Sequence, residues 1–299
     1  MTQLKSALTF QQQLYHLKND KNLIIGNERN ALIVLTKENY YRISGYALEF
    51  KKKDKFIDGT TFEQIYHLYK TDKVMRTILF ELINDIEIYL KSQLANYFSL
   101  KYGPDGYRDV SNFKNSVDAQ VMIDKCDEMI KKKPNHLVVK HHVNKYGGIL
   151  PLWAMIEMMS FGNVSKFFMN LKTKDKKEIC RSAFKDIPSD KLENFYHCLV
   201  YFRNECCHYA RLYMMRHAIQ PKLYKPSTFV NGTYDYRSTY SFILILLYVN
   251  PNKKLGEKAI AELKKLKIKS KVDFVSKYGF DPKWRNNLYK ANGHCIKYN

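Results

Sequence analysis

The amino-acid sequence predicts an all-α protein, and three observations support this prediction. Apolar residues recur with helical spacing through most of the chain, for example between Phe62 and Tyr102. Helix-start and helix-stop signals bound this stretch, namely Thr60–Thr61–Phe62–Glu63 before it and Gly103–Pro104 after it. The stretch from Lys191 to Arg216 fits a single long helix with one apolar and one polar face.

Residues 1–55 are predicted to form a small helical N-terminal subdomain. Apolar residues between Phe10 and Leu17 have the spacing of a short amphipathic helix, and Gly26–Asn27 interrupts the helical pattern after it. A second helical unit follows from Ala31 to Gly45. The basic run Lys51–Lys55 then predicts a solvated hinge before the main domain.

The rest of the chain is predicted to form a main helical domain at 56–217 and a basic helical extension at 218–299. After the helix 62–102, the helices expected in the main domain are 117–130, 152–161, 163–171, 174–184 and 191–216. Ser189 and Asp190 are expected to cap the last of these. In the extension, we expect a loop at 221–233 and two helices, an apolar one at 236–248 and a lysine-rich one at 253–271.

The functional prediction is built on the stretch Lys191–Arg216. At about 100° per residue its apolar residues fall on one stripe, which we expect to face the core: Leu192, Phe195, Leu199, Phe202, Cys206, Ala210 and Tyr213. On the same projection Asn204, His208 and Arg211 line up on the polar face. Arg203 flanks them, and His197 lies about three turns before His208 on the same line. This spacing alone is equally compatible with a plain solvated face.

The residue types on this face favour chemistry on RNA. A histidine with an ordinary pKa of about 6.5 can take or give a proton near neutral pH. A guanidinium can hold a phosphate through two hydrogen bonds and can stabilise charge as it develops. Arg203, Asn204 and His208 are therefore the candidate catalytic residues, and His197 and Arg211 are candidate RNA-binding residues.

The segment Arg203–His208 has the form R-N-x-x-x-H and resembles the signature of HEPN-domain ribonucleases. Further landmarks resemble, in their order, those of the bacterial abortive-infection AbiF/AbiD proteins: Asn39–Tyr46 (NYYRISGY), Ile86–Ile88 with Tyr102–Gly103, and Leu150–Trp153 with Glu157 and Ser160–Gly162. Together the resemblance runs from about residue 10 to residue 217. It implies a HEPN-type helical bundle and a ribonuclease activity.

The chain departs from the pattern of this family in two places. The segment Cys207–Met214 (CHYARLYM) stands where the pattern Ala-His-His-x-Arg-Leu-Trp-Asn is expected, so a second His and a final Asn are absent. Lys91 stands where an Arg often follows the Ile-Glu segment, which keeps the charge but loses the bidentate fork. No role of the absent residues is carried over to this chain.

The composition agrees with a nucleic-acid partner. The chain of 299 residues has 50 Lys and Arg against 29 Asp and Glu, a net charge of +21. Such an excess is unfavourable for a compact monomer unless an anion compensates it, and nucleic acid is the commonest such partner.

No membrane partner is expected, because the cations are spread over the chain and the longest apolar run, Phe242–Val249, is too short to cross a bilayer. The N-terminus shows no signal peptide, so we expect a cytoplasmic protein.

The lysine-rich stretch 253–271 has two interpretations. Its apolar residues share one face, so the lysines can be the ordinary solvated side of a helix. They can equally form a stripe that follows an RNA backbone, with Lys264, Lys265 and Lys267 as candidate RNA-binding residues.

Cysteines and histidines outside this pattern predict no metal site and no cofactor. The six cysteines show no C-x-x-C spacing and are expected to be reduced. A zinc site from Cys198, Cys206, Cys207 and His208 matches no usual ligand pattern. A thiol enzyme with Cys206 or Cys207 beside His208 is disfavoured, because adjacent helix positions point about 100° apart. Three histidines are expected on a surface loop beside lysines: His136, His141 and His142.

The sequence therefore predicts a metal-independent HEPN endoribonuclease that acts as a toxin or phage-defence effector of the abortive-infection kind. His208 would move a proton, Arg203 would stabilise the phosphorane and Asn204 would orient the pair, leaving 2′,3′-cyclic phosphate ends. The resemblance implies a structured noncoding RNA that restrains the activity, and the alternative is a catalytically silent RNA-binding partner. Because the family site resembles a composite of two such helices and the chain has one R-x-x-x-x-H copy, we expect a homodimer through this helix.

Overall fold

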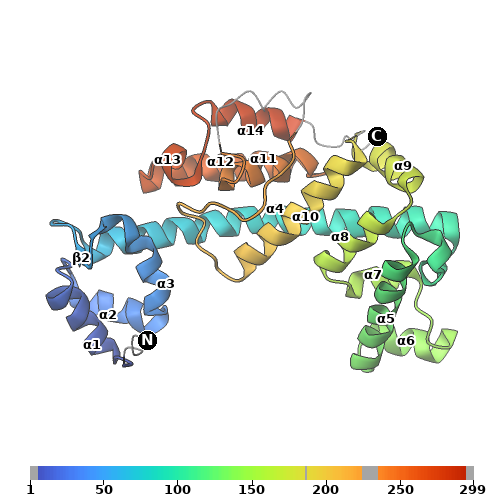
Figure 1. Ribbon diagram of the computed structural model, residues 1–299, viewed down its shortest axis with the longest axis horizontal. Helices are drawn as coiled ribbons and strands as arrows, with labels where there is room; N and C mark the ends of the chain where they lie inside the picture. The colour runs from blue at the N-terminus through green and yellow to red at the C-terminus, as the bar shows by residue number, and fades with distance from the viewer. Residues whose placement is uncertain (1–5, 186, 224–234, 294–299) are drawn as a thin grey trace.

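The structure is a computed structural model, which describes residues 6–185, 187–223 and 235–293, and it confirms the all-α prediction (Figure 1). The described residues form fourteen α-helices, short 3₁₀ and π segments, and one small antiparallel hairpin. Among these residues, none of the helices combines the length and the apolar character that crossing a bilayer requires.

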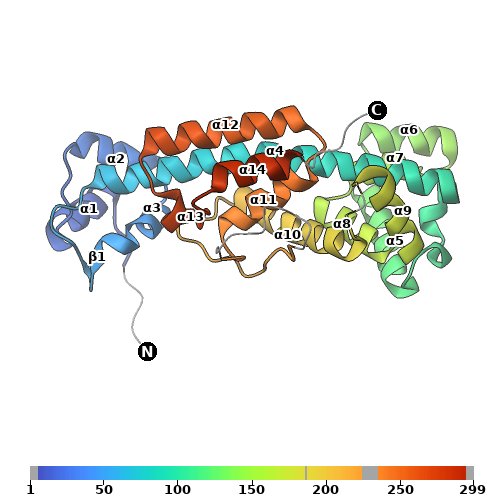
Figure 2. The same ribbon diagram turned by 90° about the horizontal axis from the view of Figure 1, so that it is seen from above.

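The helix α4, Phe62–Tyr102, runs along the length of the molecule, and the other elements are arranged on it (Figures 1 and 2). It begins with a capping box in which Thr61 Oγ1 accepts from the Gln64 N–H at 3.1 Å and Gln64 Oε1 accepts from the Thr61 N–H at 3.0 Å. The capping box lies one residue later than predicted, because Thr60 precedes the helix and its carbonyl accepts a hydrogen bond from the Ile24 N–H. The helix ends at Gly103, with a φ of +87°, as predicted.

The N-terminal helices pack around the first turns of α4 at one end of the molecule (Figure 1). They are α1 Phe10–Tyr15, α2 Glu28–Lys37 and α3 Tyr40–Ser44. The basic run predicted to be a hinge forms a hairpin instead, in which β1, Lys51–Lys52, pairs with β2, Lys55–Phe56. The ring of Phe56 is buried, so one side of this charged segment faces the core.

A second group of helices surrounds the other end of α4 (Figure 1). These are α5 Ser116–Lys132, α6 Leu137–Tyr146, α7 Leu152–Met158, α8 Phe161–Asn170 and α9 Thr173–Ala183. The prediction of a surface loop around His141 and His142 is wrong, because both lie within α6. This helix buries Val139 and ends at Gly147 in the left-handed conformation, which supplies the stop signal.

The helix α10, Ser189–Cys207, crosses α4 and packs against α8 and α9 (Figure 1). Its N-cap is Pro188 and no side chain caps it, so the predicted capping by Ser189 and Asp190 is wrong.

The C-terminal helices then pack along α4, and α12 lies beside it in Figure 2. They are α11 Thr239–Val249, α12 Lys253–Ser270, α13 Phe274–Tyr278 and α14 Trp284–Gly293. All side chains of α11 are buried. Part of the predicted loop 221–233 lies outside the described residues.

Candidate active site

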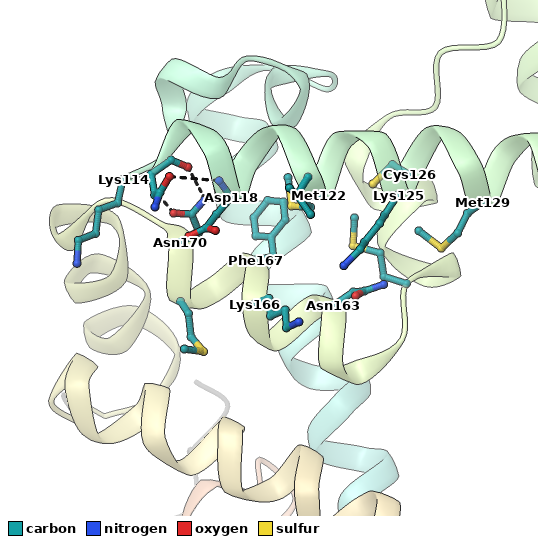
Figure 3. A pocket seen from close by; sticks show the side chains of 14 residues that line it. Lys114, Asp118, Met122, Lys125, Cys126, Met129, Asn163, Lys166, Phe167 and Asn170 are labelled. Carbon is teal, nitrogen blue, oxygen red and sulfur yellow. Dashed lines mark hydrogen bonds between the residues drawn. The ribbon is translucent and has the colours of Figure 1, made fainter.

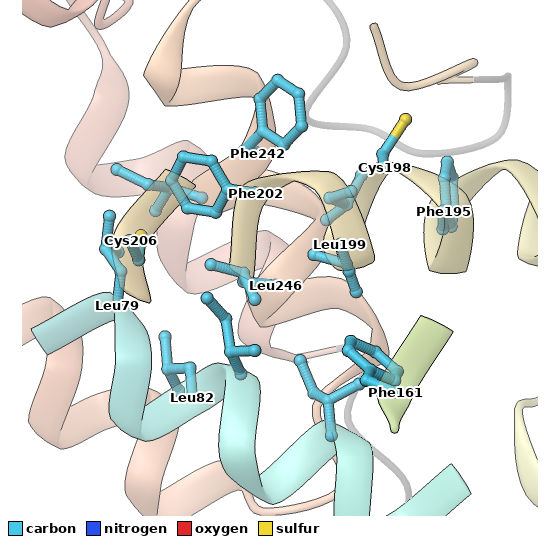
Figure 4. Close-up of a cluster of buried hydrophobic side chains, with 14 of the residues drawn as sticks. Leu79, Leu82, Phe161, Phe195, Cys198, Leu199, Phe202, Cys206, Phe242 and Leu246 are labelled. Carbon is cyan, nitrogen blue, oxygen red and sulfur yellow. The ribbon is translucent and has the colours of Figure 1, made fainter. Parts of the chain in front are cut away.

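The apolar face of α10 is buried between α4 and α11. Phe202 and Leu199 point toward Leu79 and Leu82 of α4 and toward Phe242 and Leu246 of α11 (Figure 4). The predicted stripe is confirmed as far as Cys206. Burying each large apolar side chain stabilises the fold by about 1.5–3 kcal/mol. This packing fixes the rotation of α10 about its axis and turns its polar face outward.

The helix α10 ends at Cys207, so the predicted continuation to Arg216 is wrong. Its end has the hydrogen bonds of a Schellman motif: the Ala210 N–H donates to the Glu205 carbonyl at 2.9 Å and the Tyr209 N–H to the Cys206 carbonyl at 3.3 Å. Tyr209 takes the left-handed position, with a φ of +58°, that glycine usually occupies. His208 is therefore the C-cap residue and lies exposed at the helix end.

A buried ion pair on α4 holds the chain immediately after α10. Arg76 pairs with Asp72 and donates through Nη1 to the Ala210 carbonyl at 2.9 Å. Asp72 Oδ2 accepts from the Leu212 N–H at 3.0 Å and from the Tyr46 hydroxyl at 2.6 Å. Asp72 is 0% exposed and Arg76 4%. We call Asp72, Arg76 and Tyr46 the clamp, because together they join α4, the segment after α3 and the segment after α10.

Two further arginines connect the segment after α10 to α3 and the residue that follows it. The guanidinium of Arg42 lies 5.1 Å from the centre of the Tyr209 ring, within the range of a cation–π contact. Arg211 donates through Nη1 to the Gly45 carbonyl. Arg211 thus lies beyond the end of the helix, and the prediction that it shares a helical face with Asn204 and His208 is wrong. A role for Arg211 in RNA binding stays a prediction, and its guanidinium already has a backbone partner.

The three candidate catalytic residues lie together at the end of α10. Arg203 Nη1 donates to Asn204 Oδ1 at 3.4 Å. Asn204 and His208 are four residues apart and both exposed, and the His208 N–H donates to the Asn204 carbonyl at 2.9 Å. Burial raises the pKa of the Glu205 carboxyl, and the nearby His208 opposes that rise. A guanidinium, an amide and an imidazole therefore surround one helix end, with a carboxyl group beside the imidazole.

The other predicted RNA-binding residues lie apart from this helix end. His197 is exposed on α10, eleven residues before His208 and so about 16 Å away along the axis. Lys264 donates to the Tyr289 hydroxyl at 2.9 Å, and Lys265 pairs with Glu262 at 2.8 Å. With Lys267 they belong to α12, which packs on α4 and α14. The structure does not bring these lysines to the end of α10.

Two buried cysteines near the site, Cys198 and Cys206, are poor candidates for nucleophiles or metal ligands. Burial raises the pKa of the Cys206 thiol to about 12, and that of Cys198 to about 12 as well. A thiolate, which both roles need, is therefore disfavoured at these positions. Within the part of the chain that the structure describes, no group of three or more His, Cys, Asp or Glu side chains is arranged to hold a metal ion. Cys295 lies outside the described residues.

Sequence reasoning missed the clamp as a unit. Its signal was present in the 62–102 stretch, where Asp72 and Arg76 stand four residues apart on the apolar side of the helix. Charged residues are almost never fully buried unless they are paired, so this spacing pointed to a buried ion pair. The hydroxyl and backbone partners of the pair are more than twenty residues away and left no local pattern.

A comparison with protein families places most of these elements in one known group. The model of a family described as Abi-like protein matches residues 33–214. This range begins within α2, contains all of α4 and α10, and ends two residues after Leu212. It therefore includes the candidate catalytic residues, the clamp, Arg42 and Tyr209. Neither the curated proteins nor the solved structures contain a match to the chain.

Proposed function

Because the chain belongs to the Abi-like protein family, we propose that it is an abortive-infection effector that cleaves RNA at the end of α10. Membership of the family connects the chain with abortive-infection phage defence. One observation supports the finer proposal above all: the guanidinium of Arg203 contacts the side chain of Asn204, four residues before the exposed imidazole of His208. The net charge of +21 suits an RNA substrate and a structured RNA inhibitor in the cytoplasm.

The proposed reaction is a transesterification within the RNA strand. The 2′-oxygen attacks the adjacent phosphorus and the bond to the 5′-oxygen breaks, which leaves a 2′,3′-cyclic phosphate and a 5′-hydroxyl end. A base accepts the 2′-OH proton, and an acid protonates the departing 5′-oxygen. His208 fills one of these roles, and Arg203 stabilises the charge on the phosphorane. Asn204 steadies the guanidinium through its side-chain oxygen. DNA lacks the 2′-hydroxyl and is not a substrate.

The purified protein should cleave single-stranded RNA in the presence of excess chelator, because Arg203 and His208 supply the proton transfer and the charge stabilisation in this proposal. The measurement is gel separation of a labelled RNA, followed by treatment of the products with a phosphatase that opens cyclic phosphates. Products with 2′,3′-cyclic phosphate ends are expected. Loss of cleavage on adding the chelator, or products with 5′-phosphate ends, would contradict the mechanism. Tight RNA binding without cleavage would favour a silent binding partner.

A homodimer would complete this site, because the Arg203 of one chain and the His208 of its partner would then act on one phosphate from opposite sides of a shared cleft. A two-fold axis near the end of α10 would place two copies of Arg203 and His208 across one cleft. The two guanidinium groups repel each other unless a phosphate lies between them, so RNA should favour the dimer.

Mixing two inactive variants tests the shared site. His208→Ala and Arg203→Ala subunits are combined, and up to about a quarter to a half of the wild-type cleavage rate is expected to return, since a mixed dimer keeps one intact set of groups. The control is each variant alone at the same total concentration. A fully active monomer, measured by light scattering at the assay concentration, would show that one chain is sufficient.

A further inference from the structure

The indole of Trp153 stands exposed between two hollows at the far end of α4. Trp153 is on α7, is 54% exposed and has no ring contact among the described residues. One hollow has a volume of about 560 Å³ and lies between Trp153 and the rings of α6. The other has a volume of about 460 Å³ and lies between Trp153 and the last turns of α4, from Ser92 to Leu100. Two other exposed apolar side chains, Tyr146 and Ile149, line the first hollow with Trp153, and contiguous exposed apolar surface is typical of binding sites.

The wall of the first hollow opposite Trp153 is a cluster of three aromatic rings. The centres of the His141 and His142 rings are 5.0 Å apart, and those rings lie 5.8 Å and 5.5 Å from the ring of Tyr146. Tyr146 is exposed. Pro104, Asp105, Pro151 and Ile149 complete the lining. The hollow is therefore a mainly apolar slot that has aromatic side chains on two sides and one carboxyl group in its lining.

The charged groups around the slot suit a ligand with phosphates and with N–H donors. Lys145 lies one turn after His141 on α6, and among the described residues it has no carboxylate within ion-pair distance. No Asp or Glu occurs between Lys131 and Leu150, whereas five lysines do. Glu157, one turn after Trp153, lines the second hollow and has no hydrogen-bond partner in the described chain.

We propose that this surface binds single-stranded RNA by stacking consecutive bases on the two faces of Trp153, with one base between Trp153 and the α6 rings. Flat nucleobases fill such slots, and every base has a face that stacks on an aromatic ring. Lys145 binds the backbone phosphate beside the stacked base, and Glu157 accepts from a base N–H. The inference rests on the proposed function only in taking RNA as the ligand.

The surface around Trp153 lies far from the candidate cleavage site. Arg76, in the clamp, and Asn96, in the second hollow, are twenty residues apart on α4, which is about 30 Å along its axis. In Figure 1 the end of α10 lies toward the middle of α4, whereas α6 and α7 lie at its right-hand end. RNA stacked on Trp153 thus reaches the candidate catalytic residues only along an extended strand.

A third hollow, of about 420 Å³ between α5 and α8, lacks the features that carry this inference (Figure 3). Methionine side chains line it, among them Met122 and Met129, and its single ring, Phe167, is buried. Hydrogen bonds between Asn115 and Asn170 close one end of it. It offers no exposed ring on which a base could stack.

Tryptophan fluorescence gives a direct test, because the chain has two tryptophans and the other, Trp284, is only 3% exposed. The full-length His208→Ala protein is titrated with a single-stranded RNA of mixed sequence, so that no cleavage interferes. Binding is expected to quench the fluorescence. Trp153→Phe should abolish most of the quenching and keep the affinity within about threefold, since Phe still stacks. Trp153→Ala should weaken binding about tenfold or more.

The controls separate this inference from the proposed function. Tyr15→Ala removes an exposed tyrosine from α1 and should leave the affinity unchanged, whereas Tyr146→Ala should weaken it. The Trp153 substitutions should not change binding to duplex RNA, whose bases are already stacked. RNA binding without quenching, or a Trp153→Ala protein that binds RNA as tightly as the protein with Trp153, would overturn the inference. Neither result would contradict cleavage at His208. A dimer that dissociates on Trp153→Ala substitution without RNA would instead make the surface a protein interface and overturn the RNA assignment.

Discussion

His208→Ala and Arg203→Ala are each expected to lower the rate of RNA cleavage by at least about a hundredfold while leaving the fold intact. Proton transfer by a positioned side chain contributes about 10²–10⁴-fold to a rate, and a donor aimed at developing charge contributes about 10²–10³-fold. His208 is exposed and Arg203 is half-buried, and neither belongs to the buried core, so their loss should remove little core packing. The measurement is the single-turnover cleavage rate of a labelled RNA, together with survival of cells that express each variant.

His197→Ala is the matched control for this prediction. His197 is an exposed histidine on the same helix, about 16 Å from His208 along the axis. Its substitution should change the cleavage rate by no more than about twofold, even if it contributes to RNA binding. Circular dichroism spectra and thermal unfolding midpoints should agree for all three variants and the wild type. A His208→Ala protein that cleaves at the wild-type rate would refute the assignment of the site.

Asp72→Ala is expected to lower the free energy of unfolding by about 3–5 kcal/mol, because it leaves the buried guanidinium of Arg76 without its counter-ion. The substitution also removes the acceptor of the Leu212 N–H and of the Tyr46 hydroxyl. The segment after α10 should then loosen, and RNA cleavage should fall even at temperatures where the protein stays folded. Urea unfolding followed by circular dichroism measures the first effect.

Glu81→Ala provides the comparison on the same helix, since Glu81 pairs with Lys258 at 2.8 Å on the surface of α4. An exposed ion pair is worth about 0–1 kcal/mol, so this variant should unfold close to the wild type. The double variant Asp72→Leu/Arg76→Met buries no charge and should recover part of the stability lost in Asp72→Ala. If Asp72→Ala were no less stable than Glu81→Ala, the clamp would not hold the segment after α10.

The helices whose signals lie inside their own residues could be predicted from local sequence. The apolar spacing of 62–102 and of 191–207 predicted which faces of α4 and α10 are buried, because a helix repeats every 3.6 residues and its buried stripe repeats with it. Gly103 predicted the end of α4, because a residue with a positive φ after a helix is most often glycine. The grouping of Arg203, Asn204 and His208 also followed from sequence, since residues three to five positions apart on a helix stay close in any fold.

The end of α10 and the residues beside it depend on contacts between distant segments of the chain. No glycine marks the stop, and Tyr209 takes the left-handed conformation at a cost of about 1–2 kcal/mol. Hydrogen bonds from Arg76 and to Asp72 hold the residues that follow, and Arg42 covers the Tyr209 ring. These partners come from more than 130 residues away in the chain. Local propensity favours a longer helix, and contacts between distant segments outweigh it, which turns Arg211 away from the face that Asn204 and His208 share.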